Sequence, residues 1–115
     1  MKSVHVAICL LCCLGARVFA AQLAYVGADT NKIKVLDTAT NQILNTITVG
    51  AGPNAIAVNP AGTRVYVANG QPGTVSVIDT ATNLVVQTVT VGSGPRGIAV
   101  NPSGTRVFVA NGALT

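Results

Sequence analysis

The chain has 115 residues, of which 50% are hydrophobic, 9% are charged and 3% are aromatic, and its formal net charge is +4 at pH 7. The cations are few and form no basic stripe, which is a poor electrostatic footprint for nucleic-acid binding. Because aromatic side chains are scarce, the core must be built from Val, Ile, Leu and Ala, which favours flat, repetitive layers.

The first residues have the pattern of an export signal. Lys2 is followed by an apolar run over Val6–Leu14 and by small residues around Ala20. This order predicts a secretory signal peptide over residues 1–20, cleaved near Ala20. The alternative is a membrane anchor, but the run is about half of the ~20 residues that a spanning helix needs. We therefore expect an exported protein that is periplasmic, secreted or on the cell surface, with no membrane span after cleavage.

Cleavage of this segment would change the chemistry of the chain. All the cysteines and the single histidine lie within it, namely His5, Cys9, Cys12 and Cys13. From Ala21 onward there is no Cys, His, Glu or Trp, and five cations against three aspartates give a net charge of +2. A chain exported without cysteine has no disulfides to stabilise it.

An internal repeat dominates the remaining sequence. Val49–Asn69 returns as Val91–Asn111 at an offset of 42 residues, with 16 of 21 positions identical. The preceding segment, Ile33–Val49, matches Val75–Val91 at the same offset in 9 of 17 positions. A fixed period of about 40–45 residues is the signature of an array in which each repeat is one supersecondary unit.

Short strands joined by tight turns fill each repeat. The first unit, residues 22–50, begins at Leu23–Val26 with what corresponds to the second strand of a repeat, and it supplies two more strands. In the complete unit, residues 54–92, the predicted strands are Ala55–Val58, Thr63–Asn69, Thr74–Asp79 and Leu84–Val91. Residues 96–112 supply a first and a second strand again. The apolar and alternating patterns therefore predict nine strands.

Two kinds of turn recur at fixed places. The first kind is Asn-Pro-Ala-Gly or Asn-Pro-Ser-Gly. The Asn side chain can hydrogen-bond to its own backbone, Pro fixes φ at the second position of the turn, and Gly suits the fourth position. The second kind is Asp-Thr-Ala-Thr-Asn, in which side chains cap backbone amides. We assign structural roles in these turns to Asp37, Asn59, Pro60, Gly62, Asp79, Asn101, Pro102 and Gly104.

The hairpin around Gly70–Gly73 predicts a register. If Asn69 faces Thr74, then Tyr66 faces Val77 and Arg64 faces Asp79. Opposite charges directly across a ladder stabilise a sheet by roughly 0.2–1 kcal/mol, so we predict an ion pair between the last two. The alternative, that Asp79 only caps its own turn, is compatible with the pair. Asp37 faces Leu23 or Gln22, so the first unit lacks an equivalent pair.

Four-stranded antiparallel units at this spacing predict an all-β fold with blades of a β-propeller. Small residues such as Ala55 and Gly97 suit an innermost strand, where blades converge. The alternative, a linear β-solenoid, has parallel pairing, and the hairpin turns argue against it.

The strand count amounts to a little over two blades, whereas propellers need about four to eight. This count favours a truncated reading frame with a true N-terminus and a false C-terminus. The alternative is a ring of several short chains that share blades. Exposed edges such as Val85–Val91 would otherwise promote self-association.

Tyr66–Asn69, Phe108–Asn111 and, more weakly, Tyr25–Ala28 resemble the motif that names the YVTN-family β-propeller repeat. The Val-Ile-Asp-Thr-Ala-Thr-Asn, Val-Gly-x-Gly-Pro and Asn-Pro-x-Gly-Thr-Arg blocks are similar to that family as well. The resemblance covers the chain after the signal peptide. It implies a seven-bladed propeller. Members of the family are secreted, periplasmic or cell-surface proteins, and they include archaeal surface-layer proteins. Related propellers include lactonase-like enzymes and subunits that carry quinone or haem.

Comparison of the repeats indicates where a partner would bind. The two recurring turns are nearly fixed, whereas the loops at the other end of the strands vary. Variable loops on a rigid scaffold are where binding usually resides. The candidate interaction residues are Lys32, Asn54, Gln71 and Arg96, facing a protein or a small molecule; the alternative is that each is a solvated loop tip.

No catalytic, cofactor or metal site is predicted. General acid–base chemistry normally uses His or a tuned carboxylate, and the segment after residue 20 offers only Asp29, Asp37 and Asp79. The last two sit in repeated turns, and Asp29-Thr30-Asn31 is a weak calcium signal. We therefore expect a non-enzymatic binding or surface scaffold. The alternative is the N-terminal part of a propeller enzyme, lactonase-like or a quinone- or haem-dependent dehydrogenase subunit, whose active site lies in other blades.

Overall fold

The computed structural model describes residues 6–10, 22–28 and 30–112, and within these ranges every regular element is a β-strand. The strands are β1 (Val6–Leu10), β2 (Gln22–Ala28), β3 (Lys32–Asp37), β4 (Gln42–Thr48), β5 (Pro53–Val58), β6 (Arg64–Asn69), β7 (Thr74–Asp79), β8 (Leu84–Thr90), β9 (Pro95–Val100) and β10 (Val107–Asn111). All pairings between neighbouring strands are antiparallel.

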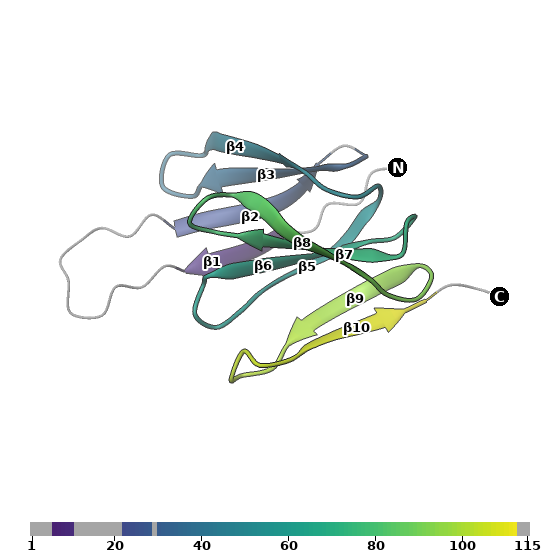
Figure 1. Cartoon of the computed structure of the whole chain (residues 1–115). Coiled ribbons are helices and arrows are strands. Elements are labelled where there is room, and N and C mark those ends of the chain that lie inside the picture. Colours follow the sequence, from purple (N-terminus) through teal and green to yellow (C-terminus); the bar gives the residue numbers. More distant parts are fainter. Residues whose placement is uncertain (1–5, 11–21, 29, 113–115) are drawn as a thin grey trace.

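The strands form three sheets in chain order. The first sheet is β1-β2-β3-β4, the second is β5-β6-β7-β8, and the third is the pair β9-β10. Figure 1 shows them one above another, with the first sheet at the top and β9–β10 at the bottom. Each complete sheet is an antiparallel meander in which every strand pairs with the next one in the sequence. This is the four-stranded unit that the 42-residue repeat predicts.

The sheets lie closer together at their first strands than at their last. The inner strand β5 contacts both β1 and β9, whereas the outer strands β4 and β8 contact each other much less. Sheets that converge at one edge and spread at the other have the geometry of propeller blades. The chain is therefore an all-β protein with the fold of a partial β-propeller.

β1 differs from the sequence prediction. The first unit was expected to have three strands, but Val6–Leu10 pairs with β2 and gives the first sheet a fourth. These residues lie within the predicted signal peptide, of which residues 1–5 and 11–20 fall outside the described ranges. A short apolar run suits the centre of a signal peptide and an inner strand equally well, so the sequence pattern does not separate the two. Cleavage near Ala20 stays a prediction.

The core lies between sheets and not inside any one of them. It is formed by side chains of the first sheet and of the second that face each other, and the fully buried members are Tyr25, Ile33, Val35, Val65, Val67 and Ile78. Burial of each such side chain contributes roughly 1.5–3 kcal/mol. This flat interlayer of aliphatic residues with one tyrosine is the core that the composition predicts.

Register follows the hairpin prediction in the second sheet. Asn69 pairs with Thr74, Tyr66 with Val77 and Arg64 with Asp79.

Both outer strands contain a register shift at the same place in the repeat, which leaves Leu44 and Val86 without a directly opposite residue. Bulges of this kind increase local twist, and both residues are exposed.

Candidate functional site

The strands of the sheets end in two different sets of connections. We call the end with the β2–β3, β4–β5, β6–β7 and β8–β9 connections the loop end, and the opposite one the turn end. At the loop end, connections from neighbouring sheets bond to each other: the Gly52 amide donates to the Thr30 carbonyl at 2.7 Å, and the Gly70 amide donates to the Gly52 carbonyl at 2.7 Å. The variable loops therefore form one hydrogen-bonded surface.

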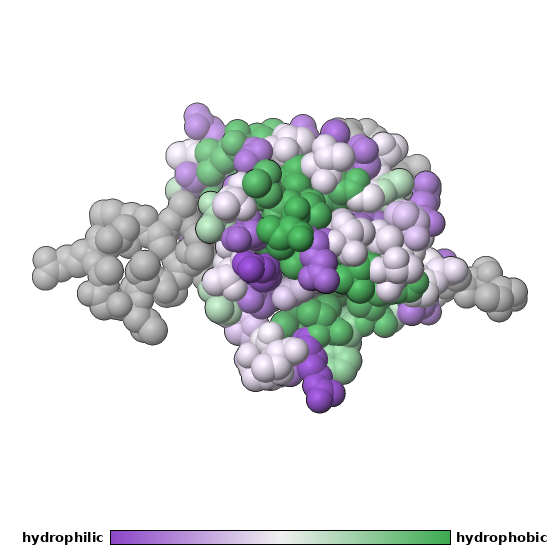
Figure 2. All heavy atoms as spheres, viewed as in Figure 1, coloured by the Kyte–Doolittle hydropathy of each residue, from purple (hydrophilic) through white to green (hydrophobic). Residues whose placement is uncertain are grey.

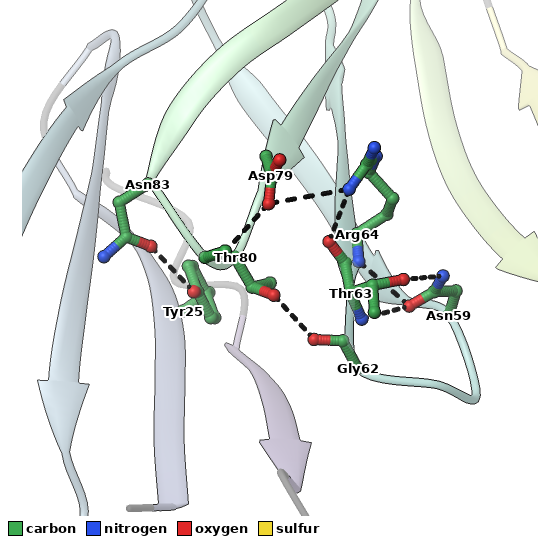
Figure 3. A network of polar contacts seen from close by, with 9 residues as sticks. Tyr25, Asn59, Gly62, Thr63, Arg64, Asp79, Thr80 and Asn83 are labelled. Carbon is green, nitrogen blue, oxygen red and sulfur yellow. Dashed lines mark hydrogen bonds and ion pairs between the residues drawn. The ribbon is translucent and has the colours of Figure 1, made fainter.

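The turn end is stabilised by side chains of the repeated turn residues (Figure 3). Asn59 Oδ1 accepts from the amides of Thr63 at 2.9 Å and Arg64 at 3.0 Å, which closes the turn between β5 and β6. Thr80 Oγ1 donates to the Gly62 carbonyl at 2.7 Å and so joins the turn between β7 and β8 to the preceding one. The structure thus gives Asn59 and Gly62 the turn role that the sequence predicts, and the equivalent Asn101 accepts from the Arg106 amide at 2.9 Å.

Asp79 has both of the roles considered for it. Its Oδ1 lies 3.5 Å from Arg64 Nη1, directly across the ladder, and also accepts from the Ala81 amide at 2.9 Å. Asp37 caps its own turn in the same way, through the Ala39 amide at 2.8 Å, but faces Leu23. The predicted ion pair is therefore confirmed in the second unit, and the first unit lacks it as expected.

Two of the candidate interaction residues keep exposed polar groups at the loop end. Gln71 lies exposed in the β6–β7 loop, against Gly52 of the preceding connection. Lys32 begins β3, and its Nζ donates to Thr48 Oγ1 at 2.9 Å on the neighbouring strand. Asp29, which the sequence offered as a weak calcium ligand, lies outside the described residues.

Asn54 and Arg96 occupy the same bulge position in β5 and β9, yet they differ in what they contact. Asn54 Nδ2 donates to the Pro95 carbonyl at 3.1 Å, so this side chain joins the second sheet to the third. The stem of Arg96 lies against Gly112, and its side chain is exposed. The structure therefore places Lys32, Gln71 and Arg96 at one end of the protein, one on each sheet, and gives Asn54 a structural contact.

Sequence reasoning missed a groove that opens between the second sheet and β10. Its volume is about 350 Å³. Apolar side chains predominate in its lining, which consists of Arg64, Tyr66, Val75, Val77, Gln87, Val89, Val91, Val107 and Val109. Figure 2 shows apolar surface between the middle sheet and the lower pair of strands, with hydrophilic side chains around it. The sequence contains a signal for this groove, because its apolar lining residues in the second sheet occupy the same places in the repeat as core residues of the first sheet.

No group of three or more His, Cys, Asp or Glu side chains lies close enough to hold a metal ion among the described residues. The described ranges also contain no helix long and apolar enough to cross a membrane.

Comparison with known proteins supports the fold. No family model matches the chain, and no curated protein matches its sequence. Among solved structures, the chain is similar to hydrazine synthase of Kuenenia stuttgartiensis, with a TM-score of 0.80 and 25% identity over 93% of this chain. It is also similar to a functionally unknown protein from Desulfotomaculum acetoxidans DSM 771, with a TM-score of 0.70 and 20% identity over 77% of this chain. The chain spans only 28% and 31% of the length of these two proteins.

Proposed function

We propose that this chain belongs to an exported, non-enzymatic binding scaffold of the YVTN-repeat type, which takes a protein or small-molecule partner at its loop end. The observation that carries this proposal is the contrast between the two ends of the sheets. The turn end repeats the same residues in the same contacts: Asn59 and Asn101 each accept from the arginine amide that closes their turn, and Asp37 and Asp79 each cap their own turn. The loop end keeps its backbone bonds but changes side chains between repeats, from Asn54 to Arg96. A rigid frame with variable loops is the usual arrangement of a binding surface.

Exposed residues at the two ends of the sheets test this proposal. Arg96 is exposed at the loop end, and Thr82 is exposed at the turn end, outside the groove. Peptides selected from a random phage-display library against the folded chain should lose binding when Arg96→Ala is combined with Lys32→Ala and Gln71→Ala. Thr82→Ala should leave their affinity unchanged. Peptides that are sensitive to Thr82→Ala and indifferent to the triple variant would overturn the assignment of the loop end.

A second candidate function is supported by the similarity to hydrazine synthase at 25% identity. On this view the chain is part of a propeller enzyme whose reacting groups lie on other blades. The test is the reading frame on either side of the chain: His and Glu clustered on loops equivalent to Gly70–Gly73 would favour the enzyme, and further Asp-Thr-Ala-Thr-Asn units would favour the scaffold.

A further inference from the structure

The groove beside β10 repeats an interface that is complete elsewhere in the same chain. The side chains of the first unit that pack against the second sheet are Tyr25, Ile33, Val35, Ile47 and Val49. The residues at the same places in the second sheet are Tyr66, Val75, Val77, Val89 and Val91, and all of them line the groove. The groove is therefore an interface of the same construction with part of its cover absent.

Exposure shows how much of that cover is absent. Ile47 is 5% exposed, whereas its equivalent Val89 is 40% exposed. In the complete interface the cover consists of Val65 and Val67 from β6 and Ile78 from β7. The third sheet supplies the equivalents of the first two, Val107 and Val109, but its described strands end at β10, so none of them corresponds to β7.

We propose that the edge of β10 away from β9 and this groove together bind a β-hairpin with the chemistry of Thr74–Thr90, whose first strand pairs with β10. Addition of an extended segment to a sheet edge gains affinity from main-chain hydrogen bonds and specificity from pockets for alternate side chains. Both parts are available here, because β10 pairs only with β9 among the described strands and the apolar groove lies next to it.

The repeat specifies which side chains the hairpin must carry. An isoleucine opposite Val107 would enter the groove in the way that Ile78, opposite Val65, enters the complete interface. An aspartate opposite Arg106 would repeat the pair between Asp79 and Arg64, and Arg106 is exposed. The strand that fits must therefore carry an isoleucine facing the groove and, at the next position, an aspartate facing the opposite side, as Val75–Asp79 does.

The turn of the hairpin would also find a hydrogen-bond donor beside the groove. In the complete interface the hydroxyl of Tyr25 donates to Asn83 Oδ1, which lies in the turn between β7 and β8, at 2.9 Å. Tyr66 occupies the equivalent place above the groove and is partly exposed. An asparagine at the end of an Asp-Thr-Ala-Thr-Asn turn would accept from this hydroxyl in the same way.

A synthetic peptide with the sequence of Gly73–Gly92, carrying a fluorophore at its N-terminus, tests the inference. Titration of the full chain into the peptide, at concentrations where light scattering shows the peptide to be monomeric, should give a saturable rise in anisotropy with 1:1 stoichiometry. Ile78→Ala in the peptide removes the groove-filling side chain and should weaken binding by about tenfold or more. Val77→Ala in the peptide is the matched control: in the added strand this side chain would lie on the face opposite Ile78, away from the groove, so the change should alter affinity little.

A charge swap tests the register. Arg106→Asp in the chain should weaken binding by about fivefold, and a peptide with Asp79→Arg should restore it. Absence of saturable binding, or equal losses from Ile78→Ala and Val77→Ala, would overturn the proposal. A chain dimer that the peptide does not displace would also overturn it and assign this face to a second copy. The result is independent of the proposed function, because the groove contains none of Lys32, Gln71 and Arg96.

Discussion

The hydroxyl of Tyr25 in β2 donates a hydrogen bond of 2.9 Å to Asn83 Oδ1, across 58 residues of sequence and from one sheet to the next. Tyr25 is fully buried, and Asn83 has a left-handed backbone with φ of 56°. Asn tolerates this conformation better than most residues. One side chain therefore shapes a turn and fixes the position of that turn on the neighbouring blade.

Replacement of Asn83 should destabilise the protein more than replacement of its counterpart in the first unit. Asn41 has the same left-handed backbone, with φ of 60°, and is exposed. Glycine suits this backbone at both positions, so Asn41→Gly should stay within about 0.5 kcal/mol of the parent protein. Asn83→Gly also removes the acceptor for Tyr25 and should cost about 0.5–1.5 kcal/mol, measured by urea unfolding.

The coupling between Tyr25 and Asn83 is measurable as a double-mutant cycle. If the hydrogen bond carries the difference, Tyr25→Phe combined with Asn83→Gly should cost less than the sum of the two single changes. Tyr25→Phe combined with Asn41→Gly should be additive. Additivity in both cycles would show that the interblade bond contributes nothing to stability.

The ion pair should make the stability of the protein depend more on Asp79 than on Asp37, its equivalent in the first unit. Asp79→Asn and Asp37→Asn both keep an oxygen for the turn cap, but only the first removes a charge opposite Arg64. Because the pair is partly exposed, we expect an extra loss of about 0.2–1 kcal/mol for Asp79→Asn. That extra loss should disappear in about 1 M salt, where the screening length falls to about 3 Å. A difference that persists in high salt would contradict an electrostatic origin.

A single methylene should distinguish the interlayer core from the outer strands. Ile78 is 0% exposed between the first two sheets, whereas Ile43 on β4 is 54% exposed. Ile78→Val should lower the free energy of unfolding by about 0.5–1.5 kcal/mol. Ile43→Val, which removes the same group, should have an effect below about 0.5 kcal/mol. Equal effects in thermal or urea unfolding would mean that the sheets do not pack as described.

Export has a direct readout in mass spectrometry. Expressed in a bacterial host with its own N-terminus, the chain should appear outside the cytoplasm with Ala21 as its first residue. Its mass should fall by that of residues 1–20. Retention of Met1 in the exported or cytoplasmic protein would contradict the signal peptide and would leave β1 available to complete the first sheet.

Much of the fold was predictable from the repeat. Strand positions in the second sheet, the turn role of Asn59 and the register that joins Arg64 to Asp79 all follow from residues close together in the sequence. Local turn chemistry and period-two alternation suffice for such contacts. The strand β1 was not predictable, because its apolar run fits two structures equally well.

Local sequence patterns are sufficient to predict the blade: its four strands, its two fixed turns and the division between constant and variable connections. The contacts between blades are seen only in the folded chain. The folded chain brings Asn54 against Pro95, joins Tyr25 to Asn83 and opens the groove beside Tyr66. Contacts within a blade are set by neighbours in the chain, whereas contacts between blades depend on how whole sheets converge, and no local pattern encodes that geometry.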